Sequence, residues 1–188
     1  MQWMLLVLVI SIFVGWARGG RLRNLTGIRV SLWWLLPLGF LLLFASVFVP
    51  SERHDIAVGL VLVSYFPLLL FVWLNRKQPG IWIAGLGILM NFTVIVLNGG
   101  MPVLEEAVVI AASAGAAGEL MFSAKHVLLT VDTQLPFLAD IIPLPGAVLS
   151  LGDVFLAIGI GSFLENQMRK PLILFAHGVK GVPGSAVE

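Results

Sequence analysis

Five long apolar runs dominate the pattern of hydrophobic and polar positions along the chain. The runs cover residues 1–17, 31–50, 56–74, 81–97 and 147–164. Each is about 17–20 residues long, the length of helix that crosses a bilayer core about 30 Å thick at about 1.5 Å per residue. The pattern predicts an all-α, polytopic membrane helix bundle of about five transmembrane helices, with one domain over residues 1–170 and a cytoplasmic tail over 171–188.

Composition supports a membrane protein. Hydrophobic residues make up 59% of the 188 positions and charged residues 11%. An ordinary soluble domain is about 25% charged, so too little charge is present here to cover a surface in water. The net charge of +1 gives no reason to expect nucleic acid as a partner. Because Cys is absent, disulfides, thiolate metal sites and thiol nucleophiles are excluded.

The distribution of charge predicts an orientation. Nine of the eleven basic residues fall on one side of a five-span bundle: Arg18, Arg21, Arg23, Arg29, Arg76, Lys77, Arg169, Lys170 and Lys180. Eight of the ten acids fall on the other: Glu52, Asp55, Glu105, Glu106, Glu119, Asp132, Asp140 and Asp153. Lys and Arg mark cytoplasmic loops, so the N-terminus is expected outside and the C-terminus in the cytoplasm.

Five of the six tryptophans lie within three residues of a predicted span end on the basic side: Trp16, Trp33, Trp34, Trp73 and Trp82. Amphipathic rings favour the headgroup layer of a bilayer, so these residues indicate an aromatic belt.

The segment 98–146 does not fit a simple span. Its apolar part, residues 107–118, is only 12 residues long, too short to cross a bilayer. We expect an outer re-entrant or interfacial segment there; a sixth span over 107–120 is the alternative, but it would move Arg169 and Lys170 outside. The prolines of residues 126–145 exclude a regular helix, and irregular backbone near a membrane lines a cavity or is covered by protein. This stretch is therefore the expected functional region.

Two aspartates are the candidate catalytic residues. Asp153 follows Ser150 at capping-box spacing, so it can simply cap the last helix. Asp140 precedes a Pro-Leu-Pro-Gly turn, residues 143–146, which can fold the chain back and bring the two carboxylates together. Two carboxylates in one site share a proton, which is what acid–base hydrolysis needs. The alternative for Asp140 is an ordinary acid in a solvated loop.

Several neighbouring residues are candidate ligand-binding groups. Asn98, Gly99 and Gly100 end the fourth span in a pattern typical of a helix stop, and the Asn98 amide could also bind a carbonyl group. His126 and Asp132 lie six positions apart in the outer segment. No metal-ligand spacing or nucleotide-binding motif is present, so we expect neither a metal nor a cofactor.

Four segments resemble a bacterial family of small multi-pass membrane proteins classed as a domain of unknown function: residues 19–25, 98–103, 134–145 and 150–160. The resemblance covers nearly the whole chain. It implies an uncharacterised type of protein in the bacterial cytoplasmic (inner) membrane and carries no reaction with it.

A second, local resemblance is to lipoprotein signal peptidase, a membrane enzyme with a catalytic aspartate dyad. Residues 98–100 are similar to its Asn-x-Gly motif and residues 151–153 to its Ala-Asp pair, with Asp140 or Asp132 as the second acid. This chain differs in having five predicted spans rather than four, in Gly152 for Ala, and in lacking Ala-Phe after Asn-Gly-Gly. The resemblance implies an aspartate-dyad hydrolase.

Two classes of function stay open. The one favoured by the lack of a strong motif is an accessory or structural subunit of a membrane complex, with membrane lipids and other membrane subunits as partners. The alternative is an outer-face aspartate-dyad membrane hydrolase, or a lipid- or peptide-binding protein.

The predicted topology can be tested with single cysteines in this Cys-free chain. Cysteines at Arg23, Lys77 and Lys170 should be shielded from an impermeant thiol reagent in intact cells. Cysteines at Glu105 and Gln134 should react. Labelling of position 170 from outside would require six spans.

Overall fold

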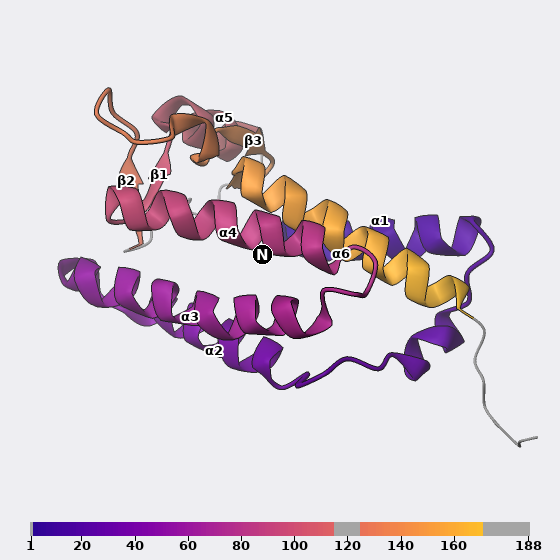
Figure 1. The fold of residues 1–188 in the computed structure, drawn as a ribbon. Coiled ribbons are helices and arrows are strands. Elements are labelled where there is room, and N and C mark those ends of the chain that lie inside the picture. Colours follow the sequence, from indigo (N-terminus) through magenta and orange to yellow (C-terminus); the bar gives the residue numbers. More distant parts are fainter. Residues whose placement is uncertain (1, 115–124, 171–188) are drawn as a thin grey trace, which may run out of the picture.

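The computed structural model describes residues 2–114 and 125–170, and the described part is mainly helical (Figure 1). Its α-helices are α1 (Gln2–Ala17), α2 (Leu35–Ala45), α3 (His54–Asn75), α4 (Ile81–Asn98), α5 (Glu105–Ala114) and α6 (Leu151–Arg169). Short 3-10 helices are η1 (Leu22–Gly27), η2 (Ser46–Phe48), η3 (Ser51–Arg53) and η4 (Pro136–Leu138). The strands are β1 (Met101–Val103), β2 (His126–Leu128), β3 (Ile142–Leu144) and β4 (Ala147–Leu149).

Each predicted span contains a helix, but the lengths differ. Two helices, α3 and α4, are long and apolar enough to cross a membrane, whereas α1 and α2 are shorter apolar helices. The predicted run 31–50 forms helix only from Leu35, because turns occupy the four residues before it and Leu32 has a left-handed φ of 49°. Among the described residues, two helices are thus candidate spans, and the other three predicted spans stay a prediction.

The last predicted span, 147–164, begins too early. Its first three residues form β4, and α6 starts at Leu151 because Ser150 is its N-cap. The Ser150 hydroxyl accepts a hydrogen bond from the Asp153 N–H, and the Asp153 carboxylate accepts one from the Ser150 N–H, which is the predicted capping box. The helix also continues beyond 164, where Glu165 pairs with Arg18 and Arg169.

The expectation of a purely α-helical chain is wrong for the outer segment. β1 pairs with β2 in parallel and β3 pairs with β4 in antiparallel orientation. Each ladder holds a proline, Pro102 or Pro143, which fits extended backbone but not a helix interior. The β3–β4 hairpin turns at Pro145 and Gly146, and Gly146 takes a φ of 76°, which glycine adopts readily.

The helices pack in the order α2, α3, α4, α6, α1. They alternate in direction, except that α6 and α1 run parallel, and the strands and α5 lie together at one end (Figure 1). The segments that carry the described basic residues of the predicted cytoplasmic side, 18–29, 76–77 and 169–170, lie at the opposite end (Figure 1). Acidic residues such as Glu105, Asp140 and Asp153 fall at the strand end.

The α4–α6 contact depends on glycine. A Cβ on Gly87 would lie 2.3 Å from the Gly152 carbonyl oxygen, and one on Gly159 would lie 2.2 Å from the Ala84 nitrogen. These distances leave no room for a side chain, so the two backbones touch. Close contact through small residues is how helices pack where no hydrophobic driving force exists between them.

Two expectations lie partly or wholly outside the described residues. α5 covers residues 107–114 of the alternative sixth span, 107–120, and residues 115–120 lie outside the described residues, so that alternative stays open. The tail 171–188 is not described.

A glycine pair tests the helix contact. Gly87→Ala should lower the free energy of unfolding by about 1–3 kcal/mol, because its methyl group would overlap backbone of α6. Gly59→Ala is the matched control in α3, where a Cβ has no neighbour within 4 Å. That variant should be neutral or raise stability by about 0.5–1 kcal/mol. Thermal unfolding in one detergent compares the two; equal effects would contradict the packing.

Candidate functional site

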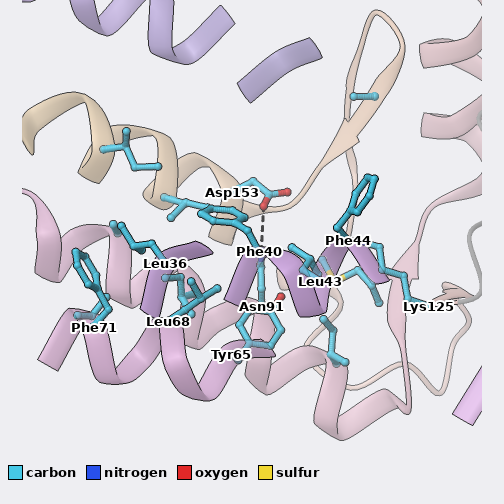
Figure 2. Close-up of a pocket in the computed structure, with 18 of the residues that line it drawn as sticks. Leu36, Phe40, Leu43, Phe44, Tyr65, Leu68, Phe71, Asn91, Lys125 and Asp153 are labelled. Atoms are coloured by element: carbon cyan, nitrogen blue, oxygen red, sulfur yellow. Dashed lines mark hydrogen bonds between the residues drawn. The ribbon is translucent and has the colours of Figure 1, made fainter. Parts of the chain in front are cut away.

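A cavity of ≈ 1230 Å³ lies between the helices, walled by α2, α3, α4 and α6 and closed at one end by the strand region. Most of its lining is aliphatic or aromatic. Its polar side chains are Tyr65, Asn91, Lys125, His126, Asp140 and Asp153. Figure 2 shows Asp153, Asn91 and Tyr65 close together, with apolar side chains such as Phe40 and Leu68 beside them. The cavity is therefore apolar with a polar region towards the strands.

Asp153 is held by a hydrogen-bonded network that joins α4 to α6. The Asn91 Nδ2 donates to Asp153 Oδ1 at 3.0 Å (Figure 2). The Asn91 Oδ1 accepts from the Ser150 hydroxyl at 2.8 Å, and the Ser150 N–H donates to Asp153 Oδ2 at 3.1 Å. Asn91, inside α4, thus makes interhelical hydrogen bonds to the first turn of α6. The network fixes the carboxylate at the first turn of α6, where an acid also complements the positive end of the helix dipole.

Gly152 makes this network possible. A Cβ at position 152 would lie 2.0 Å from Asn91 Oδ1. Any larger residue would displace the Asn91 amide that holds Asp153. The close approach of Asn91 therefore explains why this chain has Gly152 at the position of Ala in the Ala-Asp pair of lipoprotein signal peptidase.

The main chain of Asp140 is fixed on two sides. Its N–H donates to Pro102 O at 2.8 Å, and its carbonyl accepts from the Leu104 N–H at 3.0 Å. The following residue, Ile141, donates to Leu149 O at 3.1 Å, at the open end of the β3–β4 hairpin. The hairpin therefore returns the chain from Asp140 to Ser150, as the Pro-Leu-Pro-Gly turn predicts.

The Asp140 side chain is buried and only partly satisfied. Asp140 is 8% exposed, and its Oδ1 has no hydrogen-bond partner in the described structure. Burial, and to a smaller extent the negative charge of Asp153, raise the pKa of Asp140 to about 8 against the opposing effect of Lys125. No hydrogen bond between the two carboxyl groups is present among the described residues. They share one cavity and interact through their charges.

His126 is a neighbour of the Asp140 carboxyl group. Its Nε2 is 3.7 Å from Asp140 Oδ2. Burial lowers the pKa of His126 to about 4, and the neighbouring Lys125 lowers it too. Since both groups favour their uncharged forms, this close contact is between neutral groups at neutral pH and not an ion pair, although the distance alone would fit one. β1 sets the arrangement, because His126 pairs with Met101 while Asp140 bonds to Pro102.

The other predicted ligand-binding residues do not line the cavity. The Asn98 amide is bonded to the main chain of Gln134 through both its oxygen and its nitrogen, at 2.8 and 2.9 Å. Gly99 is the left-handed C-cap of α4, and Gly100 packs against Val127. Asp132 is exposed in a turn outside the cavity. Asn98, Gly99 and Gly100 have the structural role of a helix stop.

Two cavity residues were missed by the sequence analysis. Lys125 and Tyr65 both line the polar region. Lys125 directly precedes His126 and is one of only two basic residues on the acidic side, which was an available signal. Tyr65 is the single tyrosine, inside an apolar run, and nothing in the pattern separates it from packing residues.

The arrangement can perform acid–base chemistry. A protonated Asp140 can donate, and the Asp153 carboxylate can accept, on either side of a polar group in the same cavity. Across residues 2–114 and 125–170, no three His, Asp or Glu side chains gather in a way that could hold a metal ion.

Comparison with known proteins identifies a family. Residues 27–164, which contain every residue of the site described above, match a family of unknown function, DUF5317. An uncharacterised protein of Thermotoga maritima is 34% identical over 137 residues, covering 69% of this chain and 76% of the relative. No solved structure matches. Neither match bears on lipoprotein signal peptidase, so that resemblance stays a prediction. The predicted membership of a family of unknown function is confirmed: the chain belongs to the DUF5317 family.

Proposed function

We propose that this chain is a multi-pass protein of the bacterial cytoplasmic membrane that binds a ligand at its Asp140–Asp153 cavity and acts on it by acid–base hydrolysis. The observation that carries the proposal is the buried Asp140 with an unpartnered Oδ1 in the same cavity as Asp153. An unsatisfied buried polar atom costs stability, and perturbed carboxyl groups in clefts are typical of functional sites.

The membrane location in this proposal is supported by the apolar surface of the helix bundle. Besides α3 and α4, large apolar side chains are exposed on the shorter helices, for example Val9, Phe13 and Leu41 at about 60% each. The five tryptophans of the basic end are all exposed as well. Such a surface favours lipid over water. With five spans, the charge rule puts the basic end in the cytoplasm and the cavity's polar region outside.

In the proposed reaction Asp140 is the acid and Asp153 is the base. Asp153 takes a proton from water as the water oxygen attacks a carbonyl carbon, and Asp140 gives its proton to the leaving group as the bond between that group and the carbonyl carbon breaks. The proton on Asp153 then passes back to Asp140, which restores both groups. A peptide or ester bond is then cleaved with water as the only co-reactant. His126 stays neutral beside Asp140 and orients it.

The accessory-subunit alternative receives less support. It was favoured by the lack of a strong motif, and such a subunit would use glycine and alanine surfaces to pack against other subunits. Gly80, Gly87, Gly152 and Gly159 are instead used within the chain, between α4 and α6. A buried carboxyl without a partner also has no evident use in a purely structural subunit.

Conservative variants separate an active site from a helix cap. Asp153→Asn keeps the shape but cannot exchange a proton, so it should abolish the function. It should lower the free energy of unfolding by about 1–3 kcal/mol, because the amide NH2 must face one of the two donors, Asn91 Nδ2 or the Ser150 N–H, from which the carboxylate accepts. Asp140→Asn should cause the same loss, and the double variant no further loss, because the members of a catalytic unit are not additive.

The readout is rescue of a deletion strain with a growth or lipoprotein-processing defect. Asp132→Asn is the matched control, since Asp132 is exposed and outside the cavity. It should rescue fully. If Asp140→Asn and Asp153→Asn also rescue fully, the site has no acid–base role and the accessory-subunit alternative stands.

The raised pKa of Asp140 also predicts how stability depends on pH. The folded state keeps a proton up to about pH 8, whereas the unfolded state releases it near pH 3.8. Stability from this group is complete below the unfolded value and is lost as the pH rises through about 8. His126, with a pKa lowered from 6.5 to about 4, contributes the opposite trend, but only below pH 6.5.

From pH 6.5 to about 8 the free energy of unfolding should therefore fall with pH in the wild type. It should fall much less in Asp140→Asn. Denaturation in detergent at several pH values measures both. An identical slope in the two proteins would show that Asp140 does not hold the proton.

A further inference from the structure

We propose that the ligand is an acyl lipid, with its chain in the apolar part of the cavity and the carbonyl group of its ester at Asp140. This inference rests on the proposed function and names the substrate class of the same site. The scissile bond would then be the ester, with hydrolysis by water giving a carboxylic acid and an alcohol.

The apolar part of the cavity has the form of a chain-binding groove. On α6 its lining continues from Asp153 through Leu156 and Ile160 to Leu164, about 16 Å along the helix axis. α2 supplies much of the facing wall, with Leu36, Pro37, Phe40, Leu41, Leu43 and Phe44. Figure 2 shows Leu36, Phe40 and Leu43 along the cavity. A volume of ≈ 1230 Å³ exceeds the range of about 300–1,000 Å³ that is usual for small-ligand pockets.

The polar groups lie towards the strand end of this groove, where apolar residues such as Ile95 and Met101 also line it. Tyr65, Asn91, Asp140 and Asp153 are followed along α4 and α6, towards the basic end, only by apolar lining. The part of an elongated ligand that extends towards the basic end must therefore be apolar, and its polar group must lie near these four side chains. A protonated Asp140 needs an acceptor, and an ester carbonyl lies at the boundary between the chain and the polar part of a lipid.

The rim of the groove favours entry from the bilayer. Leu41 and Phe44 line the cavity and are also exposed at the bundle surface, by 64% and 47%. The lining thus continues into an apolar outer surface on α2. A molecule in the hydrocarbon phase reaches the groove without crossing water, whereas a free peptide would meet an apolar rim.

Photocrosslinking tests the inference in the full chain. The protein is reconstituted in phosphatidylethanolamine–phosphatidylglycerol vesicles that contain a phospholipid with a diazirine on one acyl chain, and labelled residues are mapped by mass spectrometry. Labelling should be enriched several-fold at groove residues such as Phe40 and Leu156 over Val63 and Phe66, which are exposed on α3 and do not line the cavity.

A variant pair on α6 gives the control. Ile160→Trp fills the groove and should remove most groove labelling, whereas Ile158→Trp, at an exposed position outside the lining, should leave it unchanged. Ile160→Phe replaces the first variant if its thermal unfolding shows misfolding. Equal labelling of groove and outer surface, or groove labelling that both groove-filling variants leave unchanged, overturns the inference.

The two proposals fail in different ways. If Ile160→Trp rescues the deletion strain while the Asp140 and Asp153 variants do not, the acid–base site stands and the acyl-chain inference is wrong. If the groove is labelled and Ile160→Trp blocks both labelling and rescue, the acyl chain is supported. If the groove is labelled but the aspartate variants rescue fully, the groove holds a lipid without hydrolysis and the ester substrate is overturned.

Discussion

The direct contact between the backbones of α4 and α6 is the constraint on which the rest of the structure depends. Gly87 and Gly152 allow it, and the contact brings Asn91 within hydrogen-bond distance of Asp153. A side-chain amide at this depth is costly without partners, and here both its oxygen and its nitrogen are bonded. The same contact leaves α2 and α3 to form the opposite wall, so the cavity lies between the α2–α3 pair and the α4–α6 pair, which meet where α3 packs on α4.

The cavity combines an apolar lining with two carboxyl groups, which proteins usually keep apart. Its apolar lining lowers the local polarity, which is why burial dominates the shift of Asp140 and the proton stays on the carboxyl. In a polar, hydrated loop the same aspartate would be ionised and of little use as an acid. Asp140 Oδ1 therefore carries the cost of an unsatisfied buried oxygen, whereas the side chains of the neighbouring Asn91–Ser150–Asp153 network are paired.

The helices were predictable because each depends on local sequence. Uncharged runs located α3 and α4, and the Ser150–Asp153 spacing located the start of α6 even though the apolar run began at 147. The return of the chain through Pro145–Gly146 was also predictable from turn chemistry. What sequence could not supply is the pairing of β1 with β2, because three-residue strands carry no periodicity and their partners lie far apart in the chain. Tyr65 was missed for the same reason, because tertiary contacts alone place it in the cavity, whereas Lys125 was marked by its basic charge on the acidic side.

The main-chain hydrogen bonds of Asp140 complete a closed circuit of chain segments and hydrogen bonds. From Asn91 the chain runs through β1, passes by hydrogen bonds to Asp140, continues through the hairpin to Ser150 and Asp153, and returns to Asn91. Residues 105–139 are an excursion outside this circuit. His126 and Lys125 belong to the excursion, whereas both carboxyl groups belong to the circuit. Insertions or exchanges in the excursion can therefore alter the surroundings of the carboxyl pair while its frame is retained.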